Sequence, residues 1–156
     1  MMNKIFHLLE ILSMISNSDE MECILSQAPN SPLSKQSTSR ISNIYAYALD
    51  HFKDKITIKE MAEVAYLSEH TFCRYFKQNF KTTFSSFLNE LRVNHASTLL
   101  IETNDLISEI CFKSGFNNFT SFNKCFKTFK KSAPTEYRKK YQNIRIKQST
   151  LTKPNL

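Results

Sequence analysis

A chain of 156 residues can hold one ordinary domain with a short extension, but not two full domains. Its single glycine and 13 phenylalanines favour a helical protein with an aromatic core over a turn-rich β fold. No apolar run approaches the roughly 18 residues that a membrane-spanning helix requires, and the start of the chain does not resemble a signal peptide. We therefore expect a cytoplasmic protein that does not enter a membrane.

The formal net charge of +7 is concentrated near the C-terminal end. Residues 110–156 contain eleven Lys and Arg and a single acidic residue, Glu136, whereas bases and acids nearly balance over residues 40–109. Such an excess is expected of a surface that faces phosphates or anionic lipid. From Lys139 onward a solvated tail is an equally good interpretation.

The four cysteines are far apart, with no CxxC pair and no histidine at ligand spacing. This spacing predicts reduced thiols that act mostly as small apolar core residues, and it predicts no metal site and no cofactor. A catalytic thiol would need a neighbouring base, which the sequence does not supply. We expect no enzymatic activity from these residues, which are Cys23, Cys73, Cys111 and Cys125.

Helical periodicity begins at the N-terminus and resumes after a polar segment. Residues 3–16 predict an amphipathic helix, and residues 17–39, rich in Ser, Asn and Pro, predict a linker. A helix is expected from Arg40. Its apolar positions are Ile41, Ile44, Tyr45, Ala48 and Phe52.

Capping residues then mark three helices in succession. Thr57 and Glu60 form a capping box that opens a helix over residues 58–65. Ser68 caps a second helix, which runs to about Phe80. Thr82 or Thr83 opens a long helix that reaches roughly Glu102.

A similar series follows from Leu106. A short helix to Ser114 is broken at Gly115, and another helix covers residues 118–130. Pro134 is well placed in the first turn of a last helix ending near Tyr141. No strand-like alternation is left, so the domain is predicted to be all-α.

The two series are an internal repeat. Each has a short helix with a small residue (Ala62 or Cys111), a tight turn and a second helix, as a helix-turn-helix requires. At an offset of 49, the set Ile58, Glu60, Met61, Ala62, Ala65 and Leu67 matches Ile107, Glu109, Ile110, Cys111, Ser114 and Phe116. At an offset of 50, the set Phe72, Arg74, Phe76 and Lys77 matches Phe122, Lys124, Phe126 and Lys127.

The sequence predicts that the second helix of each copy has an apolar side and a polar, cationic side. Facing inward are Phe72, Tyr75, Phe76 and Asn79 in one copy, and Phe122, Cys125, Phe126 and Phe129 in the other. Facing outward are His70, Arg74, Lys77 and Lys81, and Thr120, Lys124, Lys127 and Lys131. A major groove of DNA admits one such helix. A lone stripe of this kind is usually only solvated, but its repetition favours DNA binding.

Three stretches closely resemble the DNA-binding domain of AraC/XylS-type transcription regulators. They are ITIKEMAEVAYLSEHTFCRYFK, FSSFLNELRVNHASTLLIETNDLISEICFKSGFNN and FNKCFKTFKKSAPTEYRKKY, and the resemblance covers about residues 41–141. It implies a seven-helix domain of two helix-turn-helix subdomains joined by a long central helix. The expected organisation is an N-terminal helix and linker (1–39), the DNA-binding domain (40–142) and a basic, disordered tail (143–156).

The resemblance also implies a function and its residues. We expect a bacterial, sequence-specific regulator that places recognition helices 68–80 and 118–130 in successive major grooves of double-stranded DNA. By position, the base-contacting candidates are His70, Cys73, Arg74, Phe119, Thr120, Asn123 and Lys124, with Arg74 the best single reader of guanine. The phosphate-contacting candidates are Ser68, Lys77, Lys81, Lys127, Lys131 and Arg138.

The chain departs from the family pattern in three places. Lys81 and Lys131 stand where members usually have glycine after each recognition helix. Phe119 stands where a polar residue is common, so it either contacts a thymine methyl group or packs. The 39 residues before the domain are too few for the usual effector or dimerisation domain, so residues 3–16 resemble the tail of one, in a truncated or a naturally short regulator.

RNA polymerase is the expected protein partner, and residues 3–16 offer a surface for self-association. The main alternative is an interaction protein that pairs through this helix with another regulator. A DNA-alkyl acceptor using a cysteine cluster is disfavoured by the cysteine spacing. Outside these roles, Phe112 and Phe116 are expected in the core, His95 in packing, and Glu60 and Glu109 in helix caps.

Overall fold

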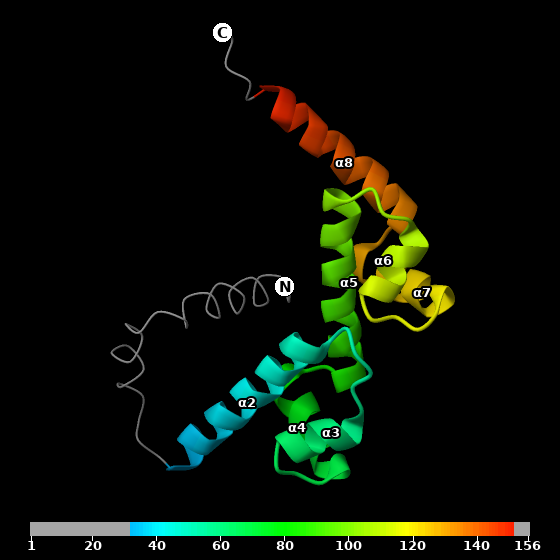
Figure 1. The fold of residues 1–156 in the computed structure, drawn as a ribbon. Coiled ribbons are helices and arrows are strands. Elements are labelled where there is room, and N and C mark those ends of the chain that lie inside the picture. Colours follow the sequence, from blue (N-terminus) through cyan, green and yellow to red (C-terminus); the bar gives the residue numbers. More distant parts are fainter. Residues whose placement is uncertain (1–31, 152–156) are drawn as a thin grey trace. The chain divides into compact units, whose positions relative to one another are not determined.

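The computed structural model describes the backbone of residues 32–151 and the side chains of residues 39–142. The chain divides into two parts, Met1–Thr38 and Ser39–Leu156, and the packing described below is that of Ser39–Leu156. The described residues form seven helices and no strand, as predicted (Figure 1): α2 (Pro32–His51), α3 (Ile58–Val64), α4 (Glu69–Phe80), α5 (Phe84–Glu102), α6 (Ile107–Lys113), α7 (Phe119–Lys130) and α8 (Pro134–Leu151). The helix expected at 3–16 lies outside the described residues.

Side-chain caps set the helix starts where the sequence predicts them. Thr57 accepts a hydrogen bond from the Glu60 backbone at 3.1 Å, while the Glu60 carboxylate accepts from the Thr57 backbone at 2.6 Å. This capping box satisfies two amides that a helix start otherwise leaves unpaired. The N-caps Ser68, Thr83 and Asn118 likewise accept from the third residue of their helices.

Two helices are longer than predicted. α2 begins at Pro32 rather than at Arg40, and α8 continues to Leu151 rather than ending near Tyr141. Proline is compatible with the first turn of a helix, and no Pro or Gly lies between Pro32 and Arg40 or between Tyr141 and Leu151. No helix breaker therefore stops either helix from continuing into the segments predicted to be linker and tail.

The N-terminal half of α5 forms the first core with α3 and α4. Phe76 lies at the centre of an aromatic cluster, with its ring centroid 5.4 Å from those of Phe84 and Phe87 on α5. Phe72 packs edge-on against Phe84 at 5.6 Å. These separations and tilts are those that aromatic pairs favour. The buried residues of α3 and α4 in this part are Met61, Ala62, Phe72 and Phe76.

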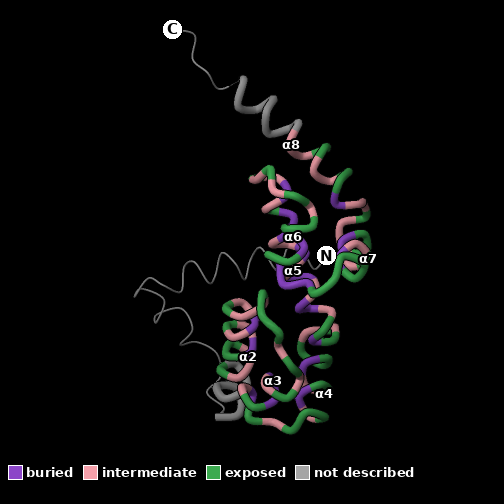
Figure 2. Tube along the Cα trace, turned by 45° about the vertical axis from the view of Figure 1, so that its right-hand side comes forward, coloured by how far each residue is buried: buried purple, intermediate pink, exposed green. Residues whose placement is uncertain are grey.

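The C-terminal half of α5 forms a second core with α6, α7 and α8. Phe122 lies 5.3 Å from Phe116 and 5.6 Å from Phe126, and the Tyr137 ring of α8 meets Phe126 edge-on at 5.3 Å. The cluster of buried residues is Val93, Ala96, Leu100, Ile110, Cys111, Phe116, Phe122 and Phe126. The burial pattern of Figure 2 follows this arrangement, with buried positions along α5 and on the sides of α4, α6 and α7.

Two residues predicted to face inward are exposed. Phe112 is 60% exposed, because α6 turns Ile107, Ile110 and Cys111 toward the core and the next position falls outside that face. Asn79 is also exposed, and its side-chain amide donates to the Tyr75 carbonyl at 2.8 Å. Both predictions of burial were wrong at the edge of an apolar face.

We predict that Phe126→Ala lowers the free energy of unfolding by about 3–5 kcal/mol, because a fully buried ring leaves a cavity. Phe112→Ala is the matched control, and we expect a change of about 0.5 kcal/mol or less at this exposed site. Urea unfolding followed by circular dichroism measures both. Equal losses in the two variants would contradict the placement of the core.

His95 gives the fold a dependence on acid. Its ring packs edge-on against Phe52 at 5.2 Å between centroids, and burial, followed by the charge of Lys53, lowers its pKa below the usual 6.5. The folded state therefore holds His95 neutral. The unfolded chain takes up its proton near pH 6.5, so this contribution to stability is present above that pH and is lost as the pH falls below it.

We predict that His95→Gln reduces the drop in Tm that accompanies acidification from about pH 7.5 to 5.5. Both chains retain the other histidines, so the difference between their two pH profiles isolates His95. Scanning calorimetry at each pH measures it. Identical profiles would show that His95 protonation does not oppose folding.

Candidate nucleic-acid interface

The two copies of the repeat fold into the same helix-turn-helix. In the first, the Leu67 amide donates to the Ala62 carbonyl at 2.9 Å across the α3–α4 turn. In the second, the Phe116 amide donates to the Cys111 carbonyl at 3.2 Å across the α6–α7 turn. Both are bonds that close a helix over a left-handed residue, and those residues are Tyr66 and Gly115.

The first candidate recognition helix, α4, has one buried side and one exposed side, as the sequence predicts. Phe72 and Phe76 are fully buried, and Tyr75 is half-buried. The opposite side of the helix and its two ends are solvent-exposed. All of the predicted contact residues of this copy lie there, namely Ser68, His70, Cys73, Arg74, Lys77 and Lys81.

The second, α7, repeats the division. Phe122 and Phe126 are fully buried. Thr120, Lys124, Lys127 and Lys131 are exposed, Asn123 is half-buried, and Phe119 is 45% exposed with its ring 6.0 Å from that of Phe122. The geometry thus brings each set of candidates onto one side of its helix.

The lysines in place of glycine keep the left-handed helix ends. Lys81 has φ of 57° and Lys131 has φ of 59°, and their amides donate to the Lys77 and Lys127 carbonyls, each at 3.0 Å. The Lys81 ammonium donates to the Gln78 carbonyl at 2.8 Å. This contact closes the end of α4, where a cation also interacts favourably with the helix dipole.

Among the candidates, Arg138 is bonded to a loop that is distant from it in the sequence. It is half-buried on α8, and its guanidinium donates to the Asp105 carbonyl at 2.7 Å. Gln142 donates to the neighbouring Thr103 carbonyl at 3.0 Å. These bonds hold the loop between α5 and α6 against α8, which gives Arg138 a structural role.

Sequence reasoning missed the role of Lys130. Its ammonium donates to the Asn94 side chain at 2.9 Å and lies near the buried Glu90, so it joins the end of α7 to α5. Burial lowers the pKa of Lys130 and raises the pKa of Glu90. The signal was its position beside Phe126 and Phe129 on the inward flank of α7, away from the cationic side.

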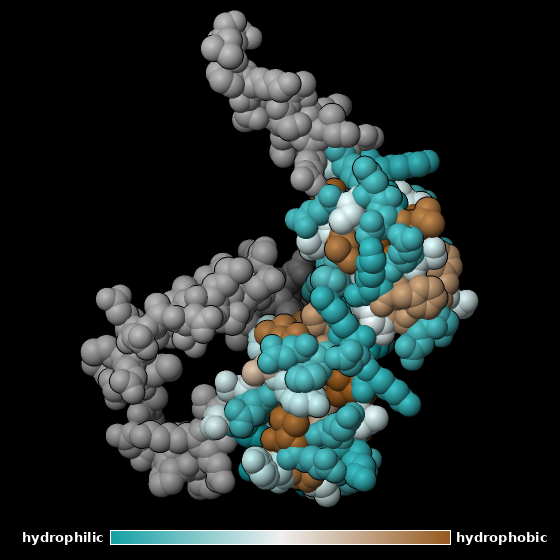
Figure 3. Space-filling view, in the orientation of Figure 1, coloured by the Kyte–Doolittle hydropathy of each residue, from teal (hydrophilic) through white to brown (hydrophobic). Residues whose placement is uncertain are grey.

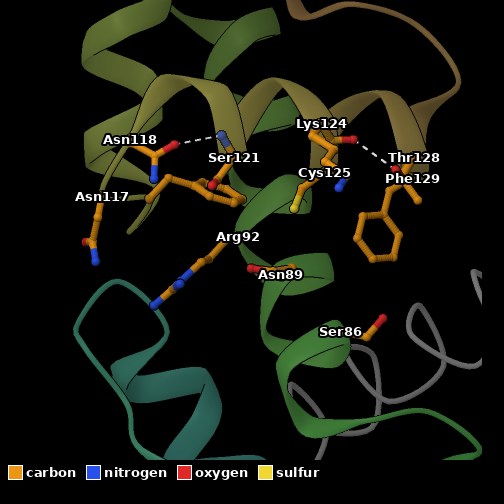
Figure 4. A pocket seen from close by; sticks show the side chains of 11 residues that line it. Ser86, Asn89, Arg92, Asn117, Asn118, Ser121, Lys124, Cys125, Thr128 and Phe129 are labelled. Atoms are coloured by element: carbon orange, nitrogen blue, oxygen red, sulfur yellow. Dashed lines mark hydrogen bonds between the residues drawn. The ribbon is translucent and has the colours of Figure 1, made fainter.

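A cleft of about 560 Å³, lined by both polar and apolar groups, lies between α5 and α7 (Figure 4). Lys124 of the cationic side lines it, together with Ser86 and Asn89 of α5 and Asn117 from the α6–α7 turn. On the face drawn in Figure 3, the described surface is mostly hydrophilic and its hydrophobic residues form separate patches. The cleft thus continues the polar surface of α7 onto α5.

The described residues contain no cluster of three or more His, Cys, Asp or Glu side chains able to hold a metal ion. Three thiols in this part are free: Cys73 is exposed, Cys111 is buried and Cys125 is half-buried. Burial raises the pKa of Cys111 and of Cys125, which favours the protonated thiol. Among the described helices, none is long and apolar enough to cross a membrane.

Comparison with known proteins identifies relatives of this part of the chain. A family model described as a helix-turn-helix domain matches residues 61–140. An uncharacterized HTH-type transcriptional regulator of Staphylococcus aureus (strain MSSA476) is 29% identical over 99 residues, which are 64% of this chain and 13% of that protein. The HTH-type regulator YisR of Bacillus subtilis (strain 168) is 32% identical over 93 residues, 60% of this chain and 32% of YisR. The chain therefore spans a minor part of the length of these relatives.

Solved structures agree with the fold. The DNA-binding domain of AdpA, a global transcriptional factor crystallised in complex with a target DNA, is 26% identical with a TM-score of 0.64, covering 68% of this chain and 96% of that one. An AraC-type regulator from Chromobacterium violaceum, at 23% identity and a TM-score of 0.62 over 69% of this chain and 96% of that one, supports the fold alone. With two helix-turn-helix units on one central helix and a family model matching 61–140, the chain belongs to the AraC-type helix-turn-helix family.

Proposed function

We propose that this chain is a sequence-specific regulator of transcription that binds double-stranded DNA by inserting α4 and α7 into successive major grooves. The observation that carries the proposal is the duplicated helix-turn-helix, in which both second helices bury phenylalanines and expose polar and cationic residues. The similarity to a domain solved with its target DNA supports it. The relatives are bacterial, and a regulator that binds chromosomal DNA in a bacterium acts in the cytoplasm.

The length of α5 supports contact with two grooves. Its 19 residues correspond to roughly 29 Å of helix at 1.5 Å per residue. Successive major grooves on one face of DNA are roughly 34 Å apart.

Base reading is assigned to residues in the N-terminal halves of α4 and α7. Arg74 offers a planar guanidinium that can pair with guanine O6 and N7, and His70 and Cys73 lie on the same exposed side. On α7, Thr120, Asn123 and Lys124 offer polar groups. Phe119 leaves enough of its ring exposed to contact a thymine methyl group while packing on Phe122.

Phosphate binding is assigned to residues that flank those readers. Lys77, Lys127 and Lys131 are exposed, and Ser68 and Lys81 lie at the two ends of α4. Such contacts fix the position of a protein on the duplex without reading its sequence. Arg138 contributes by holding the loop before α6, given its bond to Asp105.

RNA polymerase as a partner and self-association through residues 3–16 remain parts of this proposal. Residues 3–16 lie outside the described residues, so the alternative of an interaction protein that pairs through them stays a prediction. DNA selection tests the proposal directly: the 156-residue chain is used to enrich duplexes from a random pool. Enrichment of no common sequence would overturn sequence-specific binding.

We predict a steep salt dependence for the selected duplex. With the four phosphate-facing cations Lys77, Lys81, Lys127 and Lys131, the plot of log K against log salt concentration should have a slope of roughly −3 to −4. Fluorescence anisotropy over a series of KCl concentrations measures it. A slope shallower than about −2 would argue against binding across two grooves.

We predict that Arg74→Ala and Lys127→Ala weaken binding in different ways. Loss of Arg74 should relax the preference at one base position by roughly 1–3 kcal/mol, whereas loss of Lys127 should weaken specific and nonspecific duplexes alike. Lys113→Ala is the control, because this α6 cation pairs with Asp105 at 2.7 Å and belongs to neither recognition helix. Equal losses on both duplexes for Arg74→Ala would assign Arg74 to a phosphate.

A further inference from the structure

The one glycine of the sequence lies where the two helix-turn-helix units touch. Gly115, in the α6–α7 turn, has φ of +83°, and a Cβ atom there would lie 2.7 Å from the Phe52 carbonyl oxygen and 2.8 Å from the Lys53 Cα. Phe52 and Lys53 belong to the loop between α2 and α3, which leads into the first unit. Real Cβ atoms do not come so close to backbone, so a side chain at position 115 would push the loop away.

The first unit shows that the turn itself does not require glycine. Tyr66 stands at the equivalent position of the α3–α4 turn with φ of 54° and is 86% exposed. Lys81 and Lys131 also adopt positive φ elsewhere in the chain. A residue with a side chain is thus accepted in this conformation, at a cost of roughly 1 kcal/mol. What distinguishes Gly115 is the backbone packed against it.

Arg92 of α5 holds the same loop from the other side. Its Nε donates to the Phe52 carbonyl at 2.7 Å and its Nη2 donates to the Asp54 carbonyl at 2.8 Å. In Figure 4 the Arg92 side chain extends from α5 toward this loop, away from Lys124 and Cys125. Its guanidinium also lies 5.9 Å from the centre of the Phe116 ring, in the residue after Gly115. One side chain therefore contacts both units.

The junction, defined as Phe52–Asp54, Arg92 and Gly115, is further closed by the Phe52 ring against His95. The helices that pack extensively on one another either belong to the same helix-turn-helix unit or include α5 or α8. Without the junction, the two units would be related mainly through α5, and single helices bend. The junction adds a contact between units that lie on different halves of that helix.

We propose that the junction fixes the separation and rotation of α4 relative to α7. Arg92 and Gly115 are then positioning residues. They select DNA sites with one spacing between two blocks, which are the short runs of base pairs read by α4 and by α7. This inference rests on the proposed function. Neither residue reads a base in it. They restrict the arrangements of the two recognition helices, and a site with a different spacing then binds only by straining the junction or losing one unit.

The expected size of the effect follows from the population of the competent arrangement. If loss of the junction leaves the arrangement populated about one tenth of the time, the apparent Kd for the correctly spaced site rises about tenfold. Sites with altered spacing lose less, because some of the newly populated arrangements fit them. The ratio of affinities between spacings should therefore fall.

The test uses the full chain and the duplex selected with it. Insertions and deletions of one to five base pairs between the two blocks give a spacing profile for Arg92→Met, Arg92→Lys, Gly115→Ala and the unsubstituted chain. We expect a sharp profile for the unsubstituted chain and a flattened one for Arg92→Met and Gly115→Ala. Arg92→Lys, which can still donate to one carbonyl, should be intermediate.

Two matched controls separate the junction from local effects. Tyr66→Ala places alanine in the equivalent left-handed turn of the first unit, where the side chain is exposed. Lys113→Met removes a cation whose partner, Asp105, lies outside the junction. Both should retain the sharp profile. A sharp profile in folded Arg92→Met and Arg92→Lys, or flattening in the controls, would overturn the proposal.

A second readout needs no DNA. Two spin labels report the distance between the recognition helices, one at the exposed Cys73 of α4 and one at Thr128→Cys of α7. Cys23→Ser and Cys125→Ala remove two other thiols, and the buried Cys111 is left in place. We expect a narrow distribution that broadens in Arg92→Met and Gly115→Ala. Unchanged widths would overturn the inference. If the unsubstituted chain selects no duplex, the proposed function fails, while the distances still decide whether the junction fixes the units.

Discussion

Phe76 and Phe126 pack their rings on the two halves of α5, and every exposed recognition residue depends on that packing. A phenylalanine buried on one side of a short helix fixes which side remains in solvent. On α4 this leaves Arg74 and Lys77 outward, and on α7 it leaves Lys124 and Lys127 outward. Burial of each ring contributes stabilisation on the order of 2 kcal/mol, more than any single surface contact does. The orientation of the polar surface is thus a consequence of the core.

The duplication allows each unit to serve as a control for the other. Thr57 and Glu63 of the first unit correspond to Leu106 and Phe112 of the second, so neither position needs one chemical type to complete the fold. Buried Phe72 and Phe76 correspond to buried Phe122 and Phe126, which marks these positions as requirements of the scaffold. Tyr66 and Gly115 share a backbone conformation but differ in what lies against them. A difference at a matched position therefore points to a local demand of one unit.

Local signals made much of the fold predictable. Thr57, Ser68, Thr83 and Asn118 cap helices where the sequence places them, because a cap depends on residues three positions apart. The helix limits that differ, at Pro32 and Leu151, carry local signals that the prediction did not use, because proline suits a first helical turn and Pro154 follows Leu151 by three positions. Contacts between distant residues were not predictable: Arg92 with Phe52, Lys130 with Asn94 and Arg138 with Asp105 are separated by more than 30 positions. For that reason a DNA phosphate contact was predicted for Arg138, and no role was predicted for Arg92.

The same long-range contacts change what the charge of the chain means. Lys130 and Arg138 belong to the basic C-terminal third, yet one joins α7 to α5 and the other holds the loop before α6. Lys113 pairs with Asp105. Three other cations of α7 and its C-cap are exposed and follow one side of that helix, namely Lys124, Lys127 and Lys131. A phosphate backbone is recognised by position as well as by charge, so three ordered cations on a helix that the core holds in place favour DNA more strongly than the net charge of +7 does. Some basic residues thus hold the helices in place, and the fold thereby orders the remaining basic residues along one side of α7.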